Sequence, residues 1–334
     1  MTNHKASVSA IVSDSKFTTL VKPNEKQMHK LFDNSSYYQR RSFIAGILKA
    51  AGATALLSVA GTSNANSDSH AMKEYTVQDV MDIILKEIPG APFKQTVDTL
   101  KSGTAGQLVT GIVTTMFATV DVIKQAAKLK ANFIIAHEPT FYNHTDDTNW
   151  VADNKIVKAK QELLAQHGIA VWRFHDYWHS HKPDGILYGV LKKAGWGKYY
   201  KDGDRVLKIP ATSLKKIVEQ LKSSLEIAHV RVIGDLSLNC ETIGIWPGAA
   251  GGQRQVDYVE KNDPDVLIVG EAPEWETAEY FRDKVALGNK RALIVLGHSV
   301  SEEPGMEWLV EWLEPKVPGL KITHIASDTP FQWI

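Results

Sequence analysis

Hydrophobic positions along this chain follow two repeating patterns, and together they predict an α/β fold. Apolar runs of strand length occur at residues 133–136, 169–174, 266–270 and 292–297. Segments of helix length separate these runs and carry apolar residues three and four positions apart. Because parallel strands need crossover connections of this length, the alternation predicts mostly parallel sheets.

The remaining elements follow from the same reasoning. Residues 77–88 carry apolar side chains at Val77, Val80, Ile84 and Ile88, which is the spacing of one helix face. Further helices are predicted over 120–128, 152–167, 186–194, 214–225, 255–261, 274–286 and 306–313. Further strands are predicted over 108–114, 205–210, 230–234, 242–246 and 321–325.

The order of these elements predicts two interlocked α/β lobes. The N-terminal lobe is expected over 66–185 and the C-terminal lobe over 240–334, with an α/β connecting segment at 186–239. A chain of 334 residues is long enough for two such lobes, each with its own core.

The first 65 residues have the layout of an export signal. A polar stretch ends at residues 40–44 (Arg-Arg-Ser-Phe-Ile), an apolar run covers 45–59, and small residues follow up to Ala65. The paired arginines resemble a twin-arginine export motif. A membrane anchor is the alternative, but the apolar run is shorter than the ~18 residues that a spanning helix needs, and Lys49 interrupts it. We therefore expect a signal peptide over 1–65, no membrane span after processing, and a periplasmic or otherwise exported protein.

Composition limits the partners and cofactors of the protein. The chain has 38 basic and 38 acidic residues, so no nucleic-acid-binding surface is indicated. The single cysteine, Cys240, excludes an intramolecular disulfide and a thiolate-rich zinc or iron–sulfur site. It stands just before an apolar run, so we expect it to be a buried packing residue.

Histidines and carboxylates follow directly after the four apolar runs. In parallel sheets, ligands bind just beyond the carboxyl ends of the strands. Residues that follow several such strands can therefore meet at one place, and we predict a shared metal site. In chain order its candidate residues are His137 with Glu138, His175 with Asp176 and His179, Glu271, and His298 with Glu302.

The spacing within these clusters suits metal binding. His298 and Glu302 stand four residues apart, as do His175 and His179, so each pair can share one face of a helical turn. Without thiolates, the donors favour zinc, manganese, iron, nickel or cobalt. Two such ions ~3.5–4 Å apart would activate a water molecule for hydrolysis. The carboxylates available as a bridging ligand or catalytic base are Glu138, Asp176, Glu271 and Glu302.

At these residues the chain resembles the Nif-three-like family (NGG-one-interacting factor three), over about residues 74–334. The family's His-His-Pro reads His-Glu-Pro at 137–139, and its His-Thr-Asn-Leu-Asp reads His-Asp-Tyr-Trp-His at 175–179. The family's glycine- and serine-rich turn is matched by the glycine-rich turn 247–252. Its Gly-His with a following Ser-Glu is matched at 297–302, which is the clearest of the four matches.

The resemblance implies a dinuclear metal centre. Carried over position by position, the family's metal ligands fall on His137, Glu138, His179, His298 and Glu302. The family's second histidine is Glu138 here, and its aspartate is His179. These opposite exchanges keep three imidazoles and two carboxylates, so the ligands carry the same negative charge toward the ions.

Two further features could belong to this centre. By the resemblance, His175 could be a ligand, orient a ligand or contact the substrate. Glu271 would lie behind the ligands and hold them by hydrogen bonds. The turn with Gly248, Gly251 and Gly252 precedes a predicted helix, so its N–H groups could hold an anion. A tight strand-to-helix turn is the alternative, and the Lys-Ser/Thr ending of a P-loop is absent.

For function, we expect a metal-dependent hydrolase that acts on a small phosphorylated or cyclic substrate. The resemblance also implies a ring-shaped homohexamer. Family members are often labelled type-two GTP cyclohydrolase I, but cytoplasmic folate chemistry fits an exported protein poorly. Two alternatives stay open: a non-catalytic metal-binding protein for storage, delivery or partner recognition, and a scaffold whose metal joins the lobes.

Overall fold

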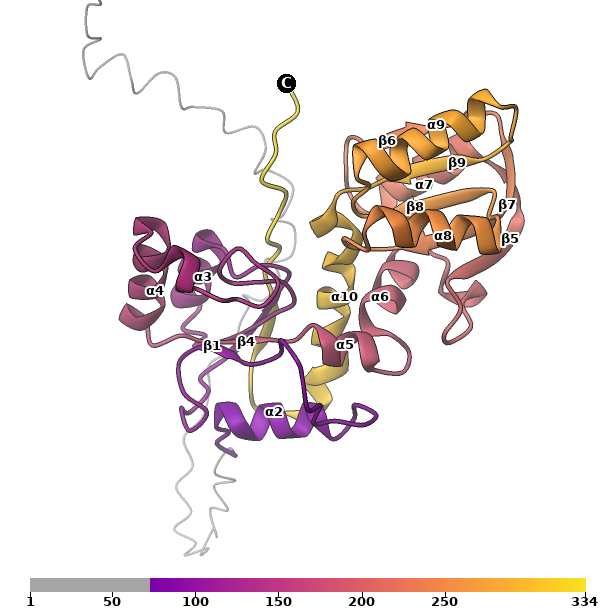
Figure 1. Ribbon diagram of the computed structural model, residues 1–334. Coiled ribbons are helices and arrows are strands. Elements are labelled where there is room, and N and C mark those ends of the chain that lie inside the picture. The colour runs from indigo at the N-terminus through magenta and orange to yellow at the C-terminus, as the bar shows by residue number, and fades with distance from the viewer. Residues whose placement is uncertain (1–72) are drawn as a thin grey trace, which may run out of the picture. The chain divides into compact units, whose positions relative to one another are not determined.

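The computed structural model describes residues 73–334, which belong to one compact unit. The expected signal peptide at 1–65 lies outside the described residues. Within 73–334, the strands form two five-stranded mixed sheets with parallel strands at their centres (Figure 1). This confirms the predicted α/β class.

The first sheet has the strand order β1–β4–β3–β2–β10. The strands β10, β2, β3 and β4 run parallel, and β1 pairs with β4 in the antiparallel direction. Every residue of β2, β3 and β4 is buried, so their sequences do not alternate and are apolar apart from Thr114, Thr115 and Arg173. The bounds are β1 Leu100–Ser102, β2 Ile112–Thr115, β3 Phe133–Ala136, β4 Ala170–Arg173 and β10 Ile322–His324.

The second sheet has the strand order β5–β7–β8–β9–β6. Its central strands β7, β8 and β9 are parallel, and both edge strands pair antiparallel with their neighbours. Cys240 on β7 is fully buried in the core of this sheet, as its sequence position predicted. The bounds are β5 Val206–Ser213, β6 Arg231–Ile233, β7 Asn239–Trp246, β8 Val266–Val269 and β9 Ala292–Val295.

Helices cover both faces of both sheets. In the first sheet, α2 (Val77–Leu85) and α10 (His298–Leu313) pack on one face, and α3 (Val120–Lys128) and α4 (Lys155–Gln166) on the other. In the second sheet, the corresponding pairs are α6 (Gly185–Lys193) with α7 (Leu214–Ser224), and α8 (Gly252–Asn262) with α9 (Glu279–Ala286). The short elements are α5 Asp176–Ser180, the π-helical turn Glu274–Ala278, and 3₁₀ turns at Asn149–Val151, Gly197–Tyr199 and Glu314–Lys316. None of the helices in the described part of the chain has the length and apolar character of a bilayer-spanning segment.

Membership of the two sheets does not follow the predicted lobe boundaries. Strands β5 and β6 lie within the expected connecting segment 186–239, yet they form the two edges of the second sheet. Strand β10 lies within the expected C-terminal lobe 240–334, yet it pairs with β2 in the first sheet. These are short or half-exposed strands, whose weak apolar pattern does not indicate which sheet they join.

Helices α6 and α10 lie side by side and tie the two sheets together (Figure 1). Gly189 of α6 approaches α10 so closely that a Cβ there would stand 2.6 Å from the backbone nitrogen of Gly305. Met306 of α10 packs into the core of the first sheet, whereas Leu187 of α6 packs into that of the second. The position of His298, the first residue of α10, therefore depends on both sheets.

Three local predictions differ from the structure. Strand β1 and helix α5 were not predicted, and α10 begins at His298 instead of residue 306. Pro304 and Gly305 lower the intrinsic helix propensity of the first half of α10. Burial of this half against both sheets overrides that preference, because tertiary packing outweighs local propensity.

Candidate metal centre

The predicted ligand residues converge where central strands of both sheets end. Strands β3 and β4 of the first sheet and β9 of the second each deliver two of them. The chain thus brings donors from distant parts of the sequence to one place, as predicted from the strand ends. The converging residues are His137 and Glu138 after β3, His175 and His179 around α5, and His298 and Glu302 in the first turns of α10.

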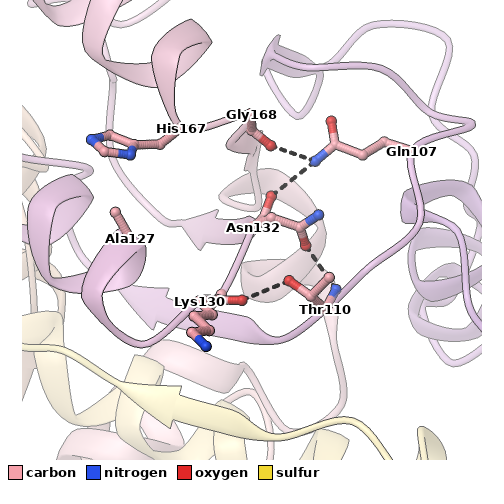
Figure 2. Close-up of a pocket in the computed structure, with 8 residues that line it drawn as sticks. Gln107, Thr110, Ala127, Lys130, Asn132, His167 and Gly168 are labelled. Carbon is pink, nitrogen blue, oxygen red and sulfur yellow. Dashed lines mark hydrogen bonds between the residues drawn. The ribbon is translucent and has the colours of Figure 1, made fainter.

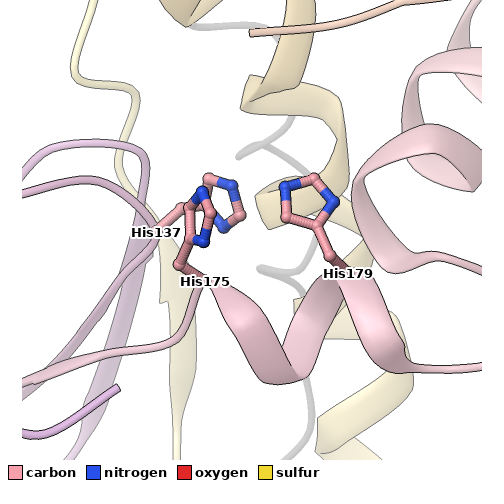
Figure 3. Close-up of side chains that lie close together, drawn as sticks. All are labelled: His137, His175 and His179. Atoms are coloured by element: carbon pink, nitrogen blue, oxygen red, sulfur yellow. The ribbon is translucent and has the colours of Figure 1, made fainter. Parts of the chain in front are cut away.

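His137, His175 and His179 form a compact group, here called the imidazole cluster. The ring centroid of His137 lies 4.7 Å from that of His175 and 5.0 Å from that of His179. The centroids of His175 and His179 are 4.9 Å apart. One nitrogen of each ring lies within 4.8 Å of the others. Figure 3 shows the three rings gathered around one point above α5. These three nitrogens could hold a metal ion.

Hydrogen bonds fix the orientation of all three rings. Each ring places Nδ1 against an oxygen acceptor, so the Nδ1–H tautomer leaves the lone pair of Nε2 free. Metal-binding histidines are held by the same kind of acceptor behind the ring. The acceptors are Phe174 O for His137 (3.1 Å), Asp176 Oδ1 for His175 (2.9 Å) and Asp184 Oδ1 for His179 (3.3 Å).

Asp98 positions α5, and sequence reasoning did not find it. This buried carboxylate accepts backbone N–H bonds from His175 (2.8 Å), Asp176 (3.1 Å) and Tyr177 (2.8 Å) at the start of the helix. Burial outweighs these bonds and raises the pKa of Asp98 to about 6. No motif surrounds Asp98, and its partners lie far along the chain, so only the folded structure reveals the contact.

Glu138, His298 and Glu302 form a second group, here called the carboxylate cluster. His298 Nε2 lies 3.2 Å from Glu138 Oε1 and 3.1 Å from Glu302 Oε2. Glu302 Oε2 also lies 3.8 Å from His137 Nε2, so this oxygen stands between the two clusters. His298 Nδ1 meets Glu271 Oε1 at 2.7 Å, which orients the ring from behind.

A fully buried arginine binds Glu138 of the carboxylate cluster through its guanidinium. Arg173, the last residue of β4, donates from Nη2 to Glu138 Oε2 (3.3 Å) and from Nε to His137 O (3.2 Å). It also donates from Nη1 to the backbone oxygen of His144. Because one oxygen of Glu138 is engaged by the guanidinium, the other is directed at His298. Arg173 stood in an apolar run, and nothing in the sequence marked it as a site residue.

The pKa values follow from burial and neighbouring charge. Burial, together with the adjacent imidazoles, holds the pKa of His137 well below its usual range. Burial opposes the charged form of Glu138, but the hydrogen bond to His298 lowers the pKa of Glu138 overall. Burial likewise opposes protonation of His298, yet Glu138, Glu271 and Glu302 outweigh it and raise the pKa of His298 to about 12. The carboxylate cluster therefore attracts positive charge strongly.

The chemistry of the donors fits divalent metal ions. His137 Nε2 is fully buried and has no hydrogen-bond partner among the described residues. Such an unsatisfied buried group costs about 1–3 kcal/mol. His137 belongs to two sets of potential metal ligands, one with His175 and His179 and one with Glu138 and Glu302. A cation beside this nitrogen satisfies it, and donors of nitrogen and oxygen type suit zinc, manganese, iron, nickel or cobalt.

One side of the centre is open to solvent. The side chains of His137 and Glu302 are 0% and 4% exposed, whereas those of His175, His179 and His298 are 20%, 31% and 21% exposed. Three of the candidate ligands are therefore partly exposed to solvent, whereas His137 and Glu302 are buried.

Asp176 and Glu271, predicted as catalytic candidates, lie behind histidine rings. Asp176 uses Oδ1 for His175 and Oδ2 for the hydroxyl of Thr96 (2.9 Å) and the N–H of Val97 (3.1 Å). Glu271 touches His298 with one oxygen, and its side chain is 54% exposed. Neither carboxylate belongs to the sets of converging ligand atoms. Their contacts match the role of orienting the rings.

The glycine turn after β7 is occupied by the protein's own carboxylates. A Cβ on Gly248 would stand 2.8 Å from Glu302 Cδ, and one on Gly252 would stand 2.7 Å from Glu276 Cδ. The N–H of Gly248 donates to Ser301 Oγ at 2.9 Å. Two carboxylates beside the turn oppose a bound anion, so this geometry favours the alternative of a tight strand-to-helix turn.

A separate hollow of about 520 Å³ lies at the opposite edge of the first sheet (Figure 2). Its polar groups bind one another: Gln107 Nε2 donates to the backbone oxygens of Asn132 (3.2 Å) and Gly168 (2.7 Å), and Thr110 Oγ1 donates to Lys130 O (2.6 Å). Because the side chains of Gln107 and Thr110 already have these partners, they are not free to bind a ligand in the hollow. The strand ends with His137 are at the other edge of the sheet.

Comparison with known proteins identifies relatives over most of the chain. Residues 75–330 match the model of the DUF34/NIF3 family (NGG1p interacting factor 3). A protein of Clostridium perfringens named GTP cyclohydrolase 1 type 2 homolog is 25% identical over 281 residues, which is 77% of this chain and 99% of that protein. A protein of Clostridium acetobutylicum with the same name is 26% identical over 222 residues, which is 62% of this chain and 77% of that protein.

Solved structures share the fold at low sequence identity. A Bacillus cereus protein related to NIF3 has a TM-score of 0.62 and 14% identity, covering 78% of this chain and 100% of that one. Staphylococcus aureus protein SA1388 has a TM-score of 0.61 and 18% identity, covering 78% and 99%. Reduced HcgD from Methanocaldococcus jannaschii has a TM-score of 0.60 and 15% identity, covering 76% and 98%.

Proposed function

The chain belongs to the DUF34/NIF3 family, and on this premise we propose that it is an exported metal-dependent hydrolase with a dinuclear centre. Its substrate is a small phosphorylated or cyclic molecule. The name of its relatives, GTP cyclohydrolase 1 type 2 homolog, agrees with hydrolysis as the reaction class. The identity of the substrate would depend on the residues that surround the centre in this chain, not on the name of its relatives.

One observation carries the proposal. His137 Nε2 is buried without a hydrogen-bond partner among the described residues, at the point where the imidazole and carboxylate clusters meet. A purely structural histidine would find a polar partner, since buried polar groups are normally hydrogen-bonded. A ligand role explains both the unsatisfied nitrogen and the convergence of donors from two sheets.

The two clusters would hold the ions, and other residues would orient them and move protons. If bound there, divalent ions would supply the charge that polarises a substrate oxygen and favours ionisation of water. Of the catalytic candidates, we assign proton transfer to Glu271, in addition to its contact behind the His298 ring. Its hydrogen bond to His298 lowers the pKa of Glu271 despite partial burial, so the carboxylate is ionised at neutral pH. Its Oε2 has no partner among the described residues, whereas both oxygens of Glu138 and of Asp176 are engaged.

The rival function is non-catalytic metal binding, and a scaffold in which metal joins the lobes is a variant of it. Structural metal sites are closed by protein ligands, whereas catalytic sites keep an open position. The exposure of His179 (31%) and His298 (21%) supports the catalytic alternative. Unfolding of the protein by a chelator would instead support the scaffold.

The experiment combines metal analysis with a hydrolysis screen. The purified protein is reconstituted with each candidate metal, and its metal content per protomer is measured by elemental analysis. Hydrolysis of bis(p-nitrophenyl) phosphate, cyclic nucleotides and GTP is then compared between wild type, His298→Ala and His167→Ala. His167 is exposed and lies in the hollow at the other edge of the sheet, so its variant is the matched control.

We expect about two ions per protomer and hydrolysis in wild type and the control, with both reduced in His298→Ala. Two bound ions without hydrolysis of any substrate would support the non-catalytic alternative. Absence of stoichiometric metal after reconstitution would refute the metal centre itself.

We further propose that the mature protein assembles as a ring-shaped homohexamer, which the family resemblance supports. Light scattering of the purified protein tests this directly. A monomer or dimer at micromolar concentration would contradict it.

A further inference from the structure

The candidate ligands of the centre form one set of imidazoles and one set rich in carboxylates. His137 lies within reach of both, so its assignment determines the composition of each set. Nδ1 of His137 faces Phe174 O at 3.1 Å, so Nε2 is the nitrogen left for a ligand. This nitrogen has one lone pair and can bind one ion. His137 therefore belongs either with His175 and His179 or with Glu138 and Glu302, although it lies within reach of both.

The geometry favours the first division. The ring of His137 is stacked on that of His175 with 28° between the planes, and it lies 5.0 Å from that of His179. His298 Nε2 is already 3.2 Å from Glu138 Oε1 and 3.1 Å from Glu302 Oε2, which completes a second set without His137. One set then has three neutral nitrogens, and the other has one nitrogen and two carboxylates.

From this division, and resting on the proposed function, we infer that the centre holds two unequal ions. The imidazole cluster binds a nitrogen-preferring ion such as zinc. The carboxylate cluster binds an ion that accepts oxygen donors readily, such as manganese. Ligand type decides such preferences, because imidazole suits zinc, iron, copper and nickel, whereas carboxylate suits magnesium, calcium and manganese.

Contacts behind the ligands strengthen the difference. Asp176 and Asp184 accept hydrogen bonds from the rings of His175 and His179, which makes their Nε2 atoms better donors, and Glu271 does the same for His298. The contact that has no counterpart in the imidazole cluster is the one made by Arg173. Arg173 instead donates to Glu138 and withdraws charge from one of its oxygens. The imidazole cluster is thereby the tighter site, and the carboxylate cluster is the more exchangeable one.

Exchange of zinc for manganese tests the inference on the full protein. Zinc-loaded protein is titrated with manganese, and both metals are measured per protomer after desalting. We expect two transitions, with one zinc displaced at manganese concentrations at least ~10-fold lower than the other, as contacts behind the ligands shift affinity 10- to 100-fold. Electron paramagnetic resonance of the half-exchanged protein should show isolated manganese, because zinc is diamagnetic.

Two variants assign the transitions to the clusters. His179→Asp places a carboxylate in the imidazole cluster and should bring the two transitions together. Glu138→Gln removes a charged ligand from the carboxylate cluster and should lose the easily exchanged ion while keeping the other. His167→Ala should leave both transitions unchanged. The wild-type titration stands even where a variant does not fold.

A single transition that displaces both zinc ions together would overturn the inference. So would a Glu138→Gln protein that loses the tightly held ion. If two equal ions are bound and hydrolysis is retained, only this inference fails. If no stoichiometric metal binds at all, the proposed function fails with it.

Discussion

Gly248 and Glu302 lie in direct contact, although one follows β7 and the other belongs to α10. A Cβ on Gly248 would stand 2.8 Å from Glu302 Cδ, and the backbone of Gly248 has φ +69°. The glycine turn thus makes room for a carboxylate of the candidate centre. The glycine turn and the Ser-Glu motif of α10 are far apart in the sequence, but they pack together at the candidate centre.

Gly248→Ala should displace Glu302 and lower metal affinity by at least ~10-fold, as loss of supporting contacts at metal sites does. The positive φ of Gly248 adds about 1–2 kcal/mol of backbone strain for a residue with a Cβ. Gly251→Ala is the matched control, because Gly251 also has a positive φ (+86°) but no atom within 4 Å of its Cβ position. Metal analysis and thermal unfolding measure the two effects. Equal metal loss in both variants would mean that strain alone is responsible.

Gly189→Ala should separate α6 from α10. Its Cβ would stand 2.6 Å from the backbone nitrogen of Gly305, and overpacking of this kind costs about 1–3 kcal/mol. Denaturant unfolding should show this loss, and metal content should fall because α10 carries His298. Gly106→Ala, with no atom within 4 Å, should change neither quantity. Unaltered stability in Gly189→Ala would contradict the tight contact between the helices.

Arg173→Met should destabilise the protein by about 3–5 kcal/mol, because it removes the buried guanidinium that binds Glu138 Oε2 and leaves that oxygen without a partner. The Arg173 side chain is 0% exposed and donates to Glu138 Oε2 at 3.3 Å. Arg231→Met is the control, since Arg231 is 53% exposed and its ion pair with Glu274 is worth about 0–1 kcal/mol. Denaturant unfolding compares the two variants. Similar losses in both would show that burial of the Arg173 pair has no special weight.

Lys160 should make stability rise with pH in the alkaline range. It is 5% exposed, donates to Thr140 O at 2.7 Å, and burial lowers its pKa to about 8 despite the opposing charge of Asp146. In the unfolded chain the pKa is about 10.4. Between these values the unfolded chain binds a proton that the folded protein has released, so the free energy of unfolding increases with pH.

Lys160→Met removes this titration. The difference in unfolding free energy between wild type and Lys160→Met should therefore change in favour of wild type from pH 7.5 to pH 10. Denaturant unfolding at both pH values measures it. A difference that does not vary with pH would mean that the Lys160 ammonium keeps its ordinary pKa.

The paired arginines at residues 40 and 41 should direct export. A fusion of residues 1–72 to a reporter that is active only outside the cytoplasm should be exported. Replacement of both arginines by lysine should retain it in the cytoplasm. Export of the lysine variant at the wild-type level would contradict a twin-arginine signal.

The α/β class, most elements and the convergence of the His and Glu residues at one place were predictable from local sequence pattern. Continuous apolar runs indicated strands that are buried on both faces of a sheet, as β3 and β8 are. The polar residues that follow such runs fall at strand ends, where parallel sheets gather ligands. Local pattern was sufficient for these features because each depends on a few neighbouring residues.

How the donors divide into two clusters, and which residues support them, could not be predicted from the sequence. Asp98, Arg173 and Asp184 act through contacts with residues on other elements, and β10 joins a sheet formed by strands near the start of the described chain. No periodicity encodes such contacts, because they depend on which strands pair and how closely helices approach. Packing of α10 on the first sheet through Met306 and Leu309 places Glu302 Oε2 3.8 Å from His137 Nε2, and such an approach depends on the whole fold.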